Sequence, residues 1–394
     1  MRLRRTLTSA AAIFGAAALA LAGCSSPQDA ANGQTDDDTP YQVGLITSKS
    51  GALANYGAQY LEGFYAGLDY ATDGTRKIGN HPIEVVEQDD TGVADVGVGH
   101  ARDLIADGVK ILAGTVVSGV ALQIAPIAEQ NEVLYISGPA AVDTLTGQNR
   151  YTFRSGRQSF QDVLAARAAI GGDPAGKKVV VFAQDTAFGQ GNAAAVGRAM
   201  TGATVVPILV PESAAEFTTF ALQALAEDAD LIYVAWAGTT APAMWTALFQ
   251  QGVLTSTTVV TGLADRVTWE AYAPLGPAVS FLAHYFDGAS DTPASQALAA
   301  ELGKPIDLFH GDGFTAAQMI VRALTEGGND VEAMIGALEG YSFEGVKGSY
   351  TVRAEDHALL QPMYLTRLVN ATTAELVEAI PATDVVPPVT PFAS

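Results

Sequence analysis

The chain has 394 residues, of which 48% are hydrophobic and 16% charged, and its formal net charge is −21. A chain of this length and composition can bury a large core and is long enough for two domains. The acidity argues against nucleic-acid binding and broad adhesion to anionic lipid, because both need clustered lysine and arginine. Scattered acidic residues chiefly confer solubility, so we infer no acidic or basic ligand from the charge.

Residues 1–23 have the three parts of an export signal. Three arginines (Arg2, Arg4 and Arg5) precede the apolar run 10–22, which ends in small residues. The apolar run is too short to span a bilayer. The segment is therefore predicted to be a signal peptide.

The signal ends in Leu21-Ala22-Gly23-Cys24, which contains the only cysteine of the chain. This stretch resembles the bacterial lipobox, which implies cleavage before Cys24 and lipidation of that residue. The mature protein would then be attached to the cell membrane by its lipid anchor only, on the extracytoplasmic side. An ordinary secretory signal with a chance cysteine is the alternative. With one cysteine, no intramolecular disulfide is possible.

After the signal, residues 24–40 are polar and lack an apolar period, which predicts a flexible tether. From Tyr41 onward, short apolar runs alternate with helical stretches, a pattern typical of parallel βαβ construction. The first series predicts strands at 42–47, 82–88, 109–114 and 133–137. The helices between them have apolar stripes (Leu61, Phe64 and Leu68; Ala101, Leu104 and Ile105; Leu122, Ile124 and Ile127). This series predicts one doubly wound sheet.

A second series of the same kind follows Arg154-Ser155-Gly156. Its predicted strands are 178–183, 203–210, 230–236 and 258–262. The chain then passes through 279–288 into predicted helices at 293–303 and 311–326, without a new full set of strands. The expected fold class is α/β, with two doubly wound lobes.

Signals for catalysis and metal binding are mostly absent. The five histidines form no HExxH or similar spacing, and no cysteine ligand lies in the folded part. No GxSxG nucleophile elbow is present, and the glycines of 189–197 have the wrong spacing for a dinucleotide fingerprint. We therefore expect no catalytic residue, no metal and no cofactor.

Signals for ligand binding are stronger. In doubly wound sheets, ligands lie beyond the carboxyl ends of the strands, beside loops and helix N-termini. The loops expected there carry small hydroxyl or aromatic side chains (Ser48, Ser50 and Tyr56; Ser118; 137–141; Phe188; Trp236) and Asp265. Ser118 precedes a helix, so that its hydroxyl and the following amides could hold a carboxylate. A plain helix N-cap is the other interpretation of this serine.

Six segments carry a family resemblance in their order and spacing. They are VGLITSKSGALANYGAQYLEG, AGTVVSG, YISGPAAVDTLT, YTFRSG, DTAFGQG and RAEDHALLQPMY. From about Tyr41 to Val369 the chain resembles the Leu/Ile/Val-binding-like substrate-binding proteins of branched-chain amino-acid ABC importers. The resemblance implies a type I periplasmic-binding clamshell that captures a small molecule and delivers it to ABC permease subunits. A monomer is expected.

The resemblance also implies lobe boundaries and hinges. The first lobe would comprise residues 41–155 with 286–357, and the second 156–285 with 358–394. Hinge segments are expected near Ser155, Ala283 and His357 (all three in the segments that would cross between the lobes).

The family's ligand residues carry over onto positions of this chain. The carboxylate would be held by Ser118 and by Ala140, Ala141 and Val142, although Val142 replaces a residue that is hydroxylated in the amino-acid binders. Aromatic walls match Tyr56 and Phe188, where Phe188 replaces a tyrosine. Trp236 lies within one position of another family aromatic, and Phe309 matches an apolar wall residue. Each ring has packing as its alternative role.

The largest departure from the family follows the strand 258–262. Amino-acid binders have an acidic residue there that pairs with the ligand ammonium, whereas this chain reads Gly262-Leu263-Ala264 before Asp265. If Asp265 turns inward, an α-amino acid remains possible; if it does not, a carboxylate or amide without the amino group would bind better. His284 and Tyr285 could supply polar contacts instead, or have a structural role.

The function expected from the sequence is capture of a small, partly apolar amino acid or a related carboxylate or amide. Two alternatives stay open. The same clamshell could act as a ligand sensor without transport, and a membrane-anchored enzyme could place serine and carboxylate chemistry in the cleft. The absence of a plausible base beside Ser118 argues against the enzyme.

Overall fold

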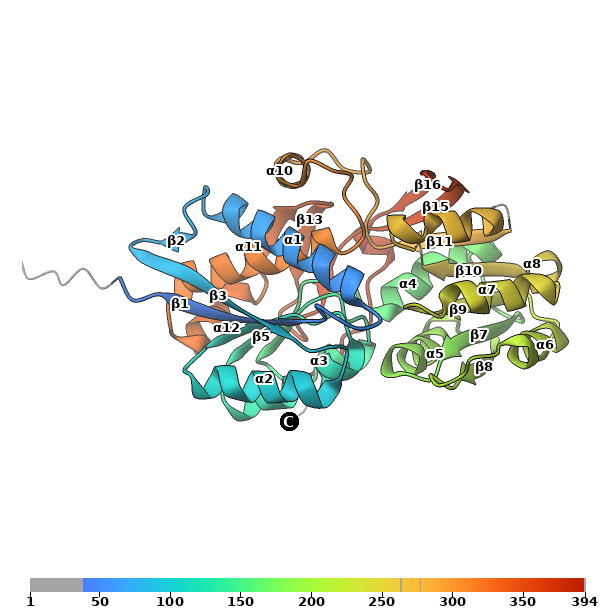
Figure 1. Cartoon of the computed structure of the whole chain (residues 1–394), viewed down its shortest axis with the longest axis horizontal. Helices are drawn as coiled ribbons and strands as arrows, with labels where there is room; N and C mark the ends of the chain where they lie inside the picture. Colours follow the sequence, from blue (N-terminus) through green and yellow to red (C-terminus); the bar gives the residue numbers. More distant parts are fainter. Residues whose placement is uncertain (1–37, 263, 277, 393–394) are drawn as a thin grey trace, which may run out of the picture. The chain divides into compact units, whose positions relative to one another are not determined.

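The structure is a computed structural model, and it describes residues 38–262, 264–276 and 278–392. These residues form two α/β lobes, each built around its own sheet (Figure 1). The predicted signal segment 1–23, Cys24 and the tether as far as residue 37 lie outside the described residues. Within the described part of the chain, no helix is both long enough and apolar enough to cross a membrane.

The first lobe contains a six-stranded sheet in the order β2-β3-β1-β4-β5-β6. Its strands are β1 (Tyr41–Thr47), β2 (Lys77–Ile78), β3 (His81–Asp89), β4 (Ile111–Ala113), β5 (Leu134–Ser137) and β6 (Thr152–Arg154). Neighbouring strands run parallel except β2 and β3, and Val43 of β1 lies opposite Val85 and Ile111. The four strands predicted in this region are confirmed to within two residues at either end. Because both faces of the sheet are covered, a central strand such as β4 is apolar and buried throughout.

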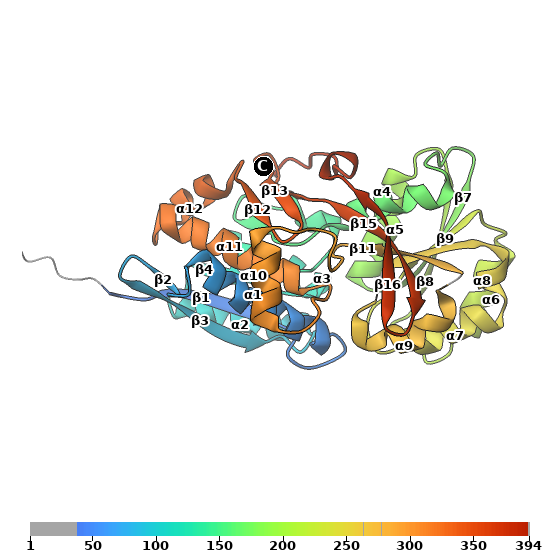
Figure 2. The same ribbon diagram turned by 90° about the horizontal axis from the view of Figure 1, so that it is seen from above.

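Helices cover both faces of the first sheet (Figure 1). One face carries α1 (Ala54–Ala71), α11 (His310–Gly327) and α12 (Val331–Leu338), and the other carries α2 (Ala94–Ala106) and α3 (Ser118–Gln130). Phe64 and Ile320 belong to the core on the first face, and Leu104 and Ile124 to the core on the second. α10 (Pro293–Leu302) lies beside α1 (Figure 2). A 3-10 turn, η1 (Asp143–Leu145), follows the loop after β5.

Two glycines allow α1 and α11 to approach each other closely. A Cβ atom at Gly63 would lie 1.9 Å from the carbonyl oxygen of His310, and one at Gly313 would lie 2.0 Å from that of Tyr60. Any side chain at these positions would force the helices apart. The close approach brings the start of α11 beside the first turns of α1, where several predicted site residues lie.

The second lobe contains a seven-stranded sheet in the order β16-β15-β11-β10-β9-β7-β8. Its strands are β7 (Lys178–Gln184), β8 (Thr204–Val210), β9 (Leu231–Ala235), β10 (Thr258–Gly262), β11 (Val279–Ala283), β15 (Met363–Asn370) and β16 (Thr373–Ile380). The first five of these run parallel, and β15 and β16 are antiparallel additions. The four strands predicted for this series are confirmed with the same accuracy.

Helices also cover both faces of the second sheet. One face carries α4 (Ser159–Ala166), η2 (Arg167–Ile170) and α5 (Ala187–Ala199). The other carries α6 (Thr218–Ala226), α7 (Ala241–Gln250), α8 (Val253–Ser256), η3 (Arg266–Thr268), α9 (Trp269–Tyr272) and η4 (Ala273–Leu275). The expected α/β class with two doubly wound lobes is therefore confirmed.

The strands at the end of the chain were not predicted from the sequence. A three-stranded sheet of β12 (Ser342–Gly345), β13 (Gly348–Val352) and β14 (Leu359–Leu360) packs on the first lobe, and β15 and β16 complete the second sheet. A last 3-10 turn, η5 (Ala382–Asp384), follows β16. Strands of two to five residues are too short to show a period, and β16 is largely exposed.

The chain crosses between the lobes three times. The crossings are 155–158 between β6 and α4, 284–292 after β11, and 361–362 between β14 and β15. Ser155 and Ala283, predicted near hinges, lie at the first two crossings, and His357 lies four residues before the third. The carboxyl ends of the central strands of both sheets are followed by the loops that carry the predicted site residues.

Candidate ligand-binding site

Ser118 is the first residue of α3 and is buried, with 3% of its surface exposed. Its Oγ accepts a hydrogen bond from the backbone N–H of Val142 at 3.4 Å. α3 has no side-chain cap, and its N-cap position is occupied by Val117. The interpretation of Ser118 as a plain N-cap is therefore wrong. Because Oγ acts only as an acceptor in the described contacts, its own hydrogen is available for a ligand.

Arg154 determines how the predicted carboxylate-binding turn is oriented. Its Nη2 donates to the carbonyl oxygen of Ala140 at 2.5 Å, and its Nη1 donates to that of Val142 at 3.0 Å. The guanidinium is fully buried and meets no carboxylate in these contacts, and burial lowers the pKa of Arg154 to about 10. In a trans peptide the N–H points opposite to the carbonyl. The Ala141 N–H therefore points away from Arg154, and no hydrogen bond within the described residues engages it.

The first crossing segment engages the remaining carbonyls of this turn. Ser159 donates to the Ala141 carbonyl through its backbone N–H at 2.8 Å and through its Oγ at 3.1 Å. Arg157 donates its Nη1 to the Pro139 carbonyl at 3.0 Å and its Nε to Asp162 at 3.2 Å. All four carbonyls of 139–142 thus accept hydrogen bonds from residues 154–159. These bonds fix the orientation of the turn, in which the N–H of Val142 meets Ser118 at the start of α3.

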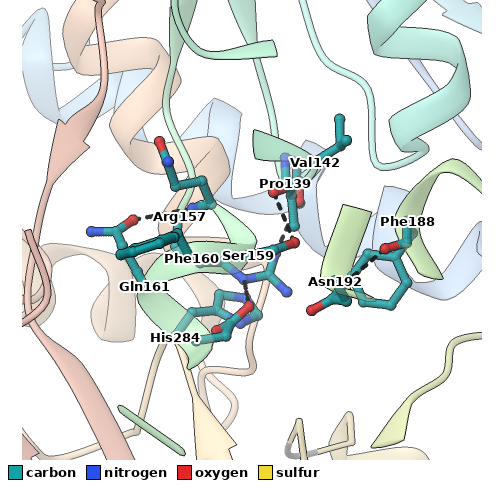
Figure 3. Close-up of polar contacts among 12 residues, drawn as sticks. Pro139, Val142, Arg157, Ser159, Phe160, Gln161, Phe188, Asn192 and His284 are labelled. Carbon is teal, nitrogen blue, oxygen red and sulfur yellow. Dashed lines mark hydrogen bonds and ion pairs between the residues drawn. The ribbon is translucent and has the colours of Figure 1, made fainter. Parts of the chain in front are cut away.

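α5 of the second lobe lies directly against this turn. A Cβ atom at Gly191 would lie 2.9 Å from Cγ2 of Val142, and one at Gly119 would lie 3.9 Å from the Cβ of Ala187. Asn192 donates to the carbonyl of Phe188 at 2.9 Å. Figure 3 shows Phe188 and Asn192 on the side of Val142 opposite to Arg157 and His284. The two lobes are therefore in contact at the predicted carboxylate site.

A row of aromatic rings lies at the junction of the two lobes. The rings of Tyr56 and Phe309 are 4.3 Å apart between centroids, and Phe309 lies 5.0 Å from the ring of His284. Tyr56 packs against the cores of both lobes, and its hydroxyl meets the backbone of Gly238. Burial raises the pKa of Tyr56 far above its ordinary value. The structure thus brings Tyr56 and Phe309 together at the junction of the lobes.

Trp236 follows β9 and packs within the second lobe. Its ring stacks on Phe182 at 5.8 Å and meets Phe217 edge-on at 5.3 Å, and its Nε1 donates to Thr240 at 3.0 Å. Among the described residues, no ring contact joins it to Tyr56, Phe188 or Phe309. The ring is only partly buried, so one part of it faces outward.

Asp265 is buried, but the protein itself occupies its carboxylate. The Nδ2 of Asn55 donates to one carboxylate oxygen, and Thr268 donates to the other at 3.0 Å. Burial raises the pKa of Asp265 above its ordinary value; the hydrogen bond from Thr268 opposes this rise, and the nearby charge of Asp307 adds to it. Asn55 was not predicted as a site residue, because no sequence motif or spacing sets this asparagine next to Tyr56 apart from any other exposed asparagine.

Asp307 joins the lobes beside this pair. It accepts from Gln59 Nε2 of α1 at 3.1 Å and from the backbone N–H of Arg266 at 2.8 Å. Arg266 also donates its Nε to the carbonyl of Ile306 at 3.1 Å. We call these hydrogen bonds, together with Asn55–Asp265, the rim contacts. Gln59 lies three residues after Tyr56 on one helix face, which is the only sequence signal for this group.

Comparison with known proteins places this arrangement in a family. Residues 40–373 match the family model described as "Periplasmic binding protein". The chain belongs to this family. Family members are substrate-binding proteins of transporters. The predicted resemblance to the type I clamshells is thereby confirmed.

Relatives of this periplasmic binding protein agree with that assignment. The Leu/Ile/Val-binding protein BraC3 of Rhizobium johnstonii is 24% identical over 48% of this chain, and the match spans 53% of BraC3, about half its length. The crystal structure of an ABC-type branched-chain amino acid transporter protein of Rhodopseudomonas palustris has a TM-score of 0.74 and 30% identity. It covers 90% of this chain and all of its own (100%).

A third relative shares the fold of this periplasmic binding protein. It is an ABC-transporter solute-binding protein of R. palustris in complex with 4-hydroxybenzoate, with a TM-score of 0.76 and 20% identity. The comparison covers 87% of this chain and 97% of that one.

Six ionisable side chains of this periplasmic binding protein gather where the chain crosses between its lobes. We call them the crossing cluster; they are Arg154, Arg157, Asp162, His284, Asp312 and Lys347. Lys347 donates its Nζ to the carbonyl of His284 at 2.6 Å, to that of Pro362 at 3.2 Å and to the side chain of Gln361. His284 Nε2 lies 3.8 Å from Asp312 Oδ2, and neither atom has a hydrogen-bond partner in the described residues.

Burial shifts the pKa values in the crossing cluster. It raises the pKa of Asp312 to about 6, lowers that of Lys347 to about 7, and lowers that of His284 well below its ordinary value. His284 is thus enclosed and neutral at the second crossing, with its ring 5.0 Å from that of Phe309. Tyr285 packs in an apolar cluster with Leu298 and Phe314, which is a structural role.

Two other features of this periplasmic binding protein do not suggest a site. Within residues 38–262, 264–276 and 278–392, no three His, Cys, Asp or Glu side chains gather as a metal ion would require. A hollow of about 570 Å³ lies at the amino ends of β10 and β11, and none of the predicted site residues lines it. Its one charged lining residue, Arg367, already pairs with Glu375.

Proposed function

We propose that this chain is an extracytoplasmic solute-binding lipoprotein of an ABC importer. It captures a small, partly apolar amino acid, or a related carboxylate or amide, by closure of its lobes and delivers it to permease subunits. The observation that carries this proposal is the turn 139–142, whose four carbonyls are engaged by residues 154–159. We place the ligand carboxylate between the Ser118 hydroxyl, which lies against the Val142 N–H, and the Ala141 N–H, which points away from Arg154.

That position suits a carboxylate for three reasons. The Ser118 hydroxyl and the Ala141 amide are both donors, and hydrogen bonds to an ionised acceptor are stronger than neutral ones. The N-terminus of α3 adds partial positive charge and unpaired amides. Recognition by the backbone also explains why Val142 can replace a hydroxylated residue, because its N–H rather than its side chain contacts Ser118.

The remainder of the ligand would lie among aromatic rings supplied by both lobes. Tyr56 and Phe309 come from the first lobe, and Phe188 and Trp236 come from the second. A ligand that contacts both lobes favours the closed form over the open one, which is the basis of capture. Lobes of 41–155 with 286–357 and of 156–285 with 358–394, hinged near Ser155, Ala283 and His357, are consistent with the two sheets.

The related structures support a small carboxylate as the ligand. One relative is described as a branched-chain amino acid transporter protein, and another holds 4-hydroxybenzoate. Both kinds of molecule carry a carboxylate next to an apolar body. The same fold therefore accommodates the ligand class proposed here.

A thermal-shift screen of the purified protein tests the function. Branched-chain and aromatic amino acids, their deaminated carboxylates and small amides would be added at saturating concentration. A ligand at a hundred times its dissociation constant adds about 2.7 kcal/mol to the free energy of unfolding, which raises the melting temperature measurably. If no compound of these classes stabilises the protein, the proposed ligand class is wrong.

Ser118→Ala tests the carboxylate site within that screen. Loss of one hydrogen bond to a charged group weakens binding by about 1.5–3 kcal/mol, roughly tenfold or more in Kd. The melting temperature of the free protein should stay close to that of the wild type. Ser213→Ala, at an exposed turn in the second lobe, is the matched control. Unchanged affinity with a clear loss of stability would assign Ser118 a structural role only.

Attachment of the mature protein through Cys24 is part of the proposal. Expression in a bacterial host with a fatty-acid label should give a labelled, membrane-associated product, and Cys24→Ser should abolish both. A Cys24→Ser protein that remains membrane-associated would exclude the lipid anchor.

A further inference from the structure

The structure also bears on the charge of the ligand. We propose that the natural ligand is a carboxylate that carries no ammonium group on the carbon next to the carboxylate. This inference rests on the proposed function and narrows it. It depends on which partners the buried acidic side chains already have within the protein.

An α-amino acid would place its ammonium close to the carboxylate. The two groups share one carbon, so the ammonium nitrogen lies within about 3 Å of the nearer carboxylate oxygen. With the carboxylate between Ser118 and Ala141, a buried ammonium needs an acidic partner at this end of the site. The question is therefore whether a free carboxylate faces this position.

The buried acids on the side of the turn are already engaged: Asp90 accepts from Ser48, Thr115 and the N–H of Gly92, and two others have cationic partners. Asp162 pairs with Arg157 at 3.2 Å. Asp143 pairs with Arg198 and accepts from the N–H of Phe160 at 2.9 Å. Each of these carboxylates is thus used by the protein.

Asp312 is enclosed behind the turn. It is 3% exposed, and a Cβ atom at Gly156 would lie 3.0 Å from its Oδ2. Gly156 of the crossing segment thus packs against this oxygen, which lies 3.8 Å from Nε2 of His284 and has no hydrogen-bond partner within the described residues. Burial outweighs the attraction of Lys347, so that the pKa of Asp312 is raised and its charged form is disfavoured.

Asp265, the candidate from the sequence, is engaged at the rim. One of its oxygens accepts from Asn55 and the other from Thr268. The charged and phenolic groups that interact with it are Tyr56, Tyr272 and Asp307, all on the rim side. Within the described residues, no hydrogen bond connects Asp265 with Ser118 or with the turn 139–142.

Position 262, at the carboxyl end of β10, also offers no acid. Gly262 is exposed, and a Cβ atom there would meet nothing within 4 Å. Space for a side chain exists at this strand end, but the chain has none there. The contrast with the engaged Asp265 suggests that this end of the site is not built to hold a cation.

The charges nearest the turn are positive. Arg154 and Arg157 both donate into its carbonyls, and Nη2 of Arg157 makes no hydrogen bond within the described residues. A guanidinium beside the site attracts a carboxylate and repels an ammonium. Asp265 is engaged at the rim, Asp312 is enclosed beside His284, and guanidinium groups donate into the turn; each of these features disfavours an α-ammonium group.

Matched pairs of ligands test the inference directly. The probes are 3-phenylpropanoate against phenylalanine and 4-methylpentanoate against leucine, measured by calorimetry on the purified protein. Each pair differs only by the α-ammonium group. We expect the deaminated member of at least one pair to bind on the order of tenfold to a hundredfold more tightly, as an unpaired buried charged group implies.

The outcomes separate this inference from the proposed function. Tighter binding of phenylalanine or leucine than of the deaminated partner would overturn the inference and leave a solute-binding function intact. Failure of all four probes would overturn the inference for these ligand bodies, and the wider screen above would then decide the function.

Asp265→Asn provides a second, independent test. If Asp265 held a ligand ammonium, this variant would weaken amino-acid binding selectively and change the ratio of the two Kd values within a pair. We expect the ratio to stay within about threefold of the wild type, since loss of a rim contact affects both members equally. A tenfold selective loss of the amino acid would overturn the inference even if the variant is less stable. Thr268→Val, which removes only the second partner of Asp265, is the matched control.

Discussion

The crossing cluster and the rim contacts both join the two lobes, but they use charge differently. In the crossing cluster, Asp312 and Lys347 are 3% and 6% exposed and lie beside the covalent crossings. At the rim, Asn55 is exposed and meets Asp265 across the junction of the lobes, without a nearby chain connection. Charged side chains thus meet one another where the chain holds the lobes together. At the rim, Asp265 and Asp307 accept from neutral donors, and the guanidinium of Arg266 meets a backbone carbonyl.

The difference has a physical reason. Separating two buried ions costs several kcal/mol. A cluster of buried ions is therefore expected at the crossings, where closing and opening of the lobes change the distances between side chains least. A neutral amide on a carboxylate is exchanged for water at small net cost, because an exposed donor regains its hydrogen bonds in solvent. Contacts that must break when the lobes separate are therefore expected to resemble the rim rather than the crossing cluster.

Removing Lys347 should have the largest effect on stability. Lys347→Met keeps most of the side-chain volume, but leaves three oxygen acceptors without a donor and Asp312 without its cation. We expect a loss of about 3–5 kcal/mol in the free energy of unfolding, measured by urea denaturation.

Lys304→Met is the matched control for that variant. Lys304 pairs with Glu62 at 2.8 Å, but both side chains are largely exposed, at 50% and 41%. Its loss should cost less than about 1 kcal/mol. Equal effects of the two variants would show that burial does not distinguish the crossing cluster.

Asp312→Asn should remove a pH dependence of stability. Burial raises the folded-state pKa of Asp312 from 3.8 to about 6, so the folded protein binds this proton more tightly than the unfolded chain. The contribution of Asp312 to the free energy of unfolding therefore falls as pH rises from about 4 to about 6. The difference in melting temperature between the wild type and Asp312→Asn, scanned over that window, isolates it. A difference that is constant across the window would contradict the raised pKa.

Asn55→Ala should have the smallest effect on the free protein. It removes one exposed donor from Asp265 at the rim, so we expect less than about 1 kcal/mol in the free energy of unfolding. Ligand affinity should fall a few-fold, because the closed form loses a contact that the open form lacks. Calorimetry with the ligand found in the screen measures this change. A loss of stability comparable to that of Lys347→Met would show that the rim and the crossing cluster do not differ as described.

Much of the fold followed from patterns within single segments. β1, β7 and β9 are apolar runs of five to seven residues that are buried by helices on both faces, and such runs are visible in the sequence. β14, with two residues, shows no such pattern. β15 joins the second sheet by antiparallel pairing with β11, a contact between residues about 80 apart in the chain, and β16 pairs with β15.

The site was predictable only where a family pattern exists. Ser118 and the turn 140–142 were expected together, and the structure places Val142 on Ser118. Trp236 was expected in the cleft, yet its ring packs chiefly on Phe182 and Phe217. The sequence shows an aromatic residue at a strand end, but not which side of the loop its ring occupies.

The long-range polar contacts could not be predicted. Asn55 and Asp265 are 210 residues apart, and Gln59 and Asp307 are 248 apart. Each of these residues is ordinary in its local context. The first contact arises only when the two lobes meet, and the second only when α1 packs against the segment that precedes α11. A buried Arg154 was likewise unremarkable in the sequence, because its role depends on carbonyl groups that every residue carries.

The way Arg154 holds the turn affects how the protein can evolve. Main-chain amides cannot be substituted, so under the proposed function changes in the surrounding side chains would leave carboxylate capture intact while the aromatic walls vary. A receptor with this arrangement would exchange one ligand body for another by a few substitutions at positions such as 56, 188 and 309. The anchored turn would then separate the invariant part of recognition from the part that selection is free to alter.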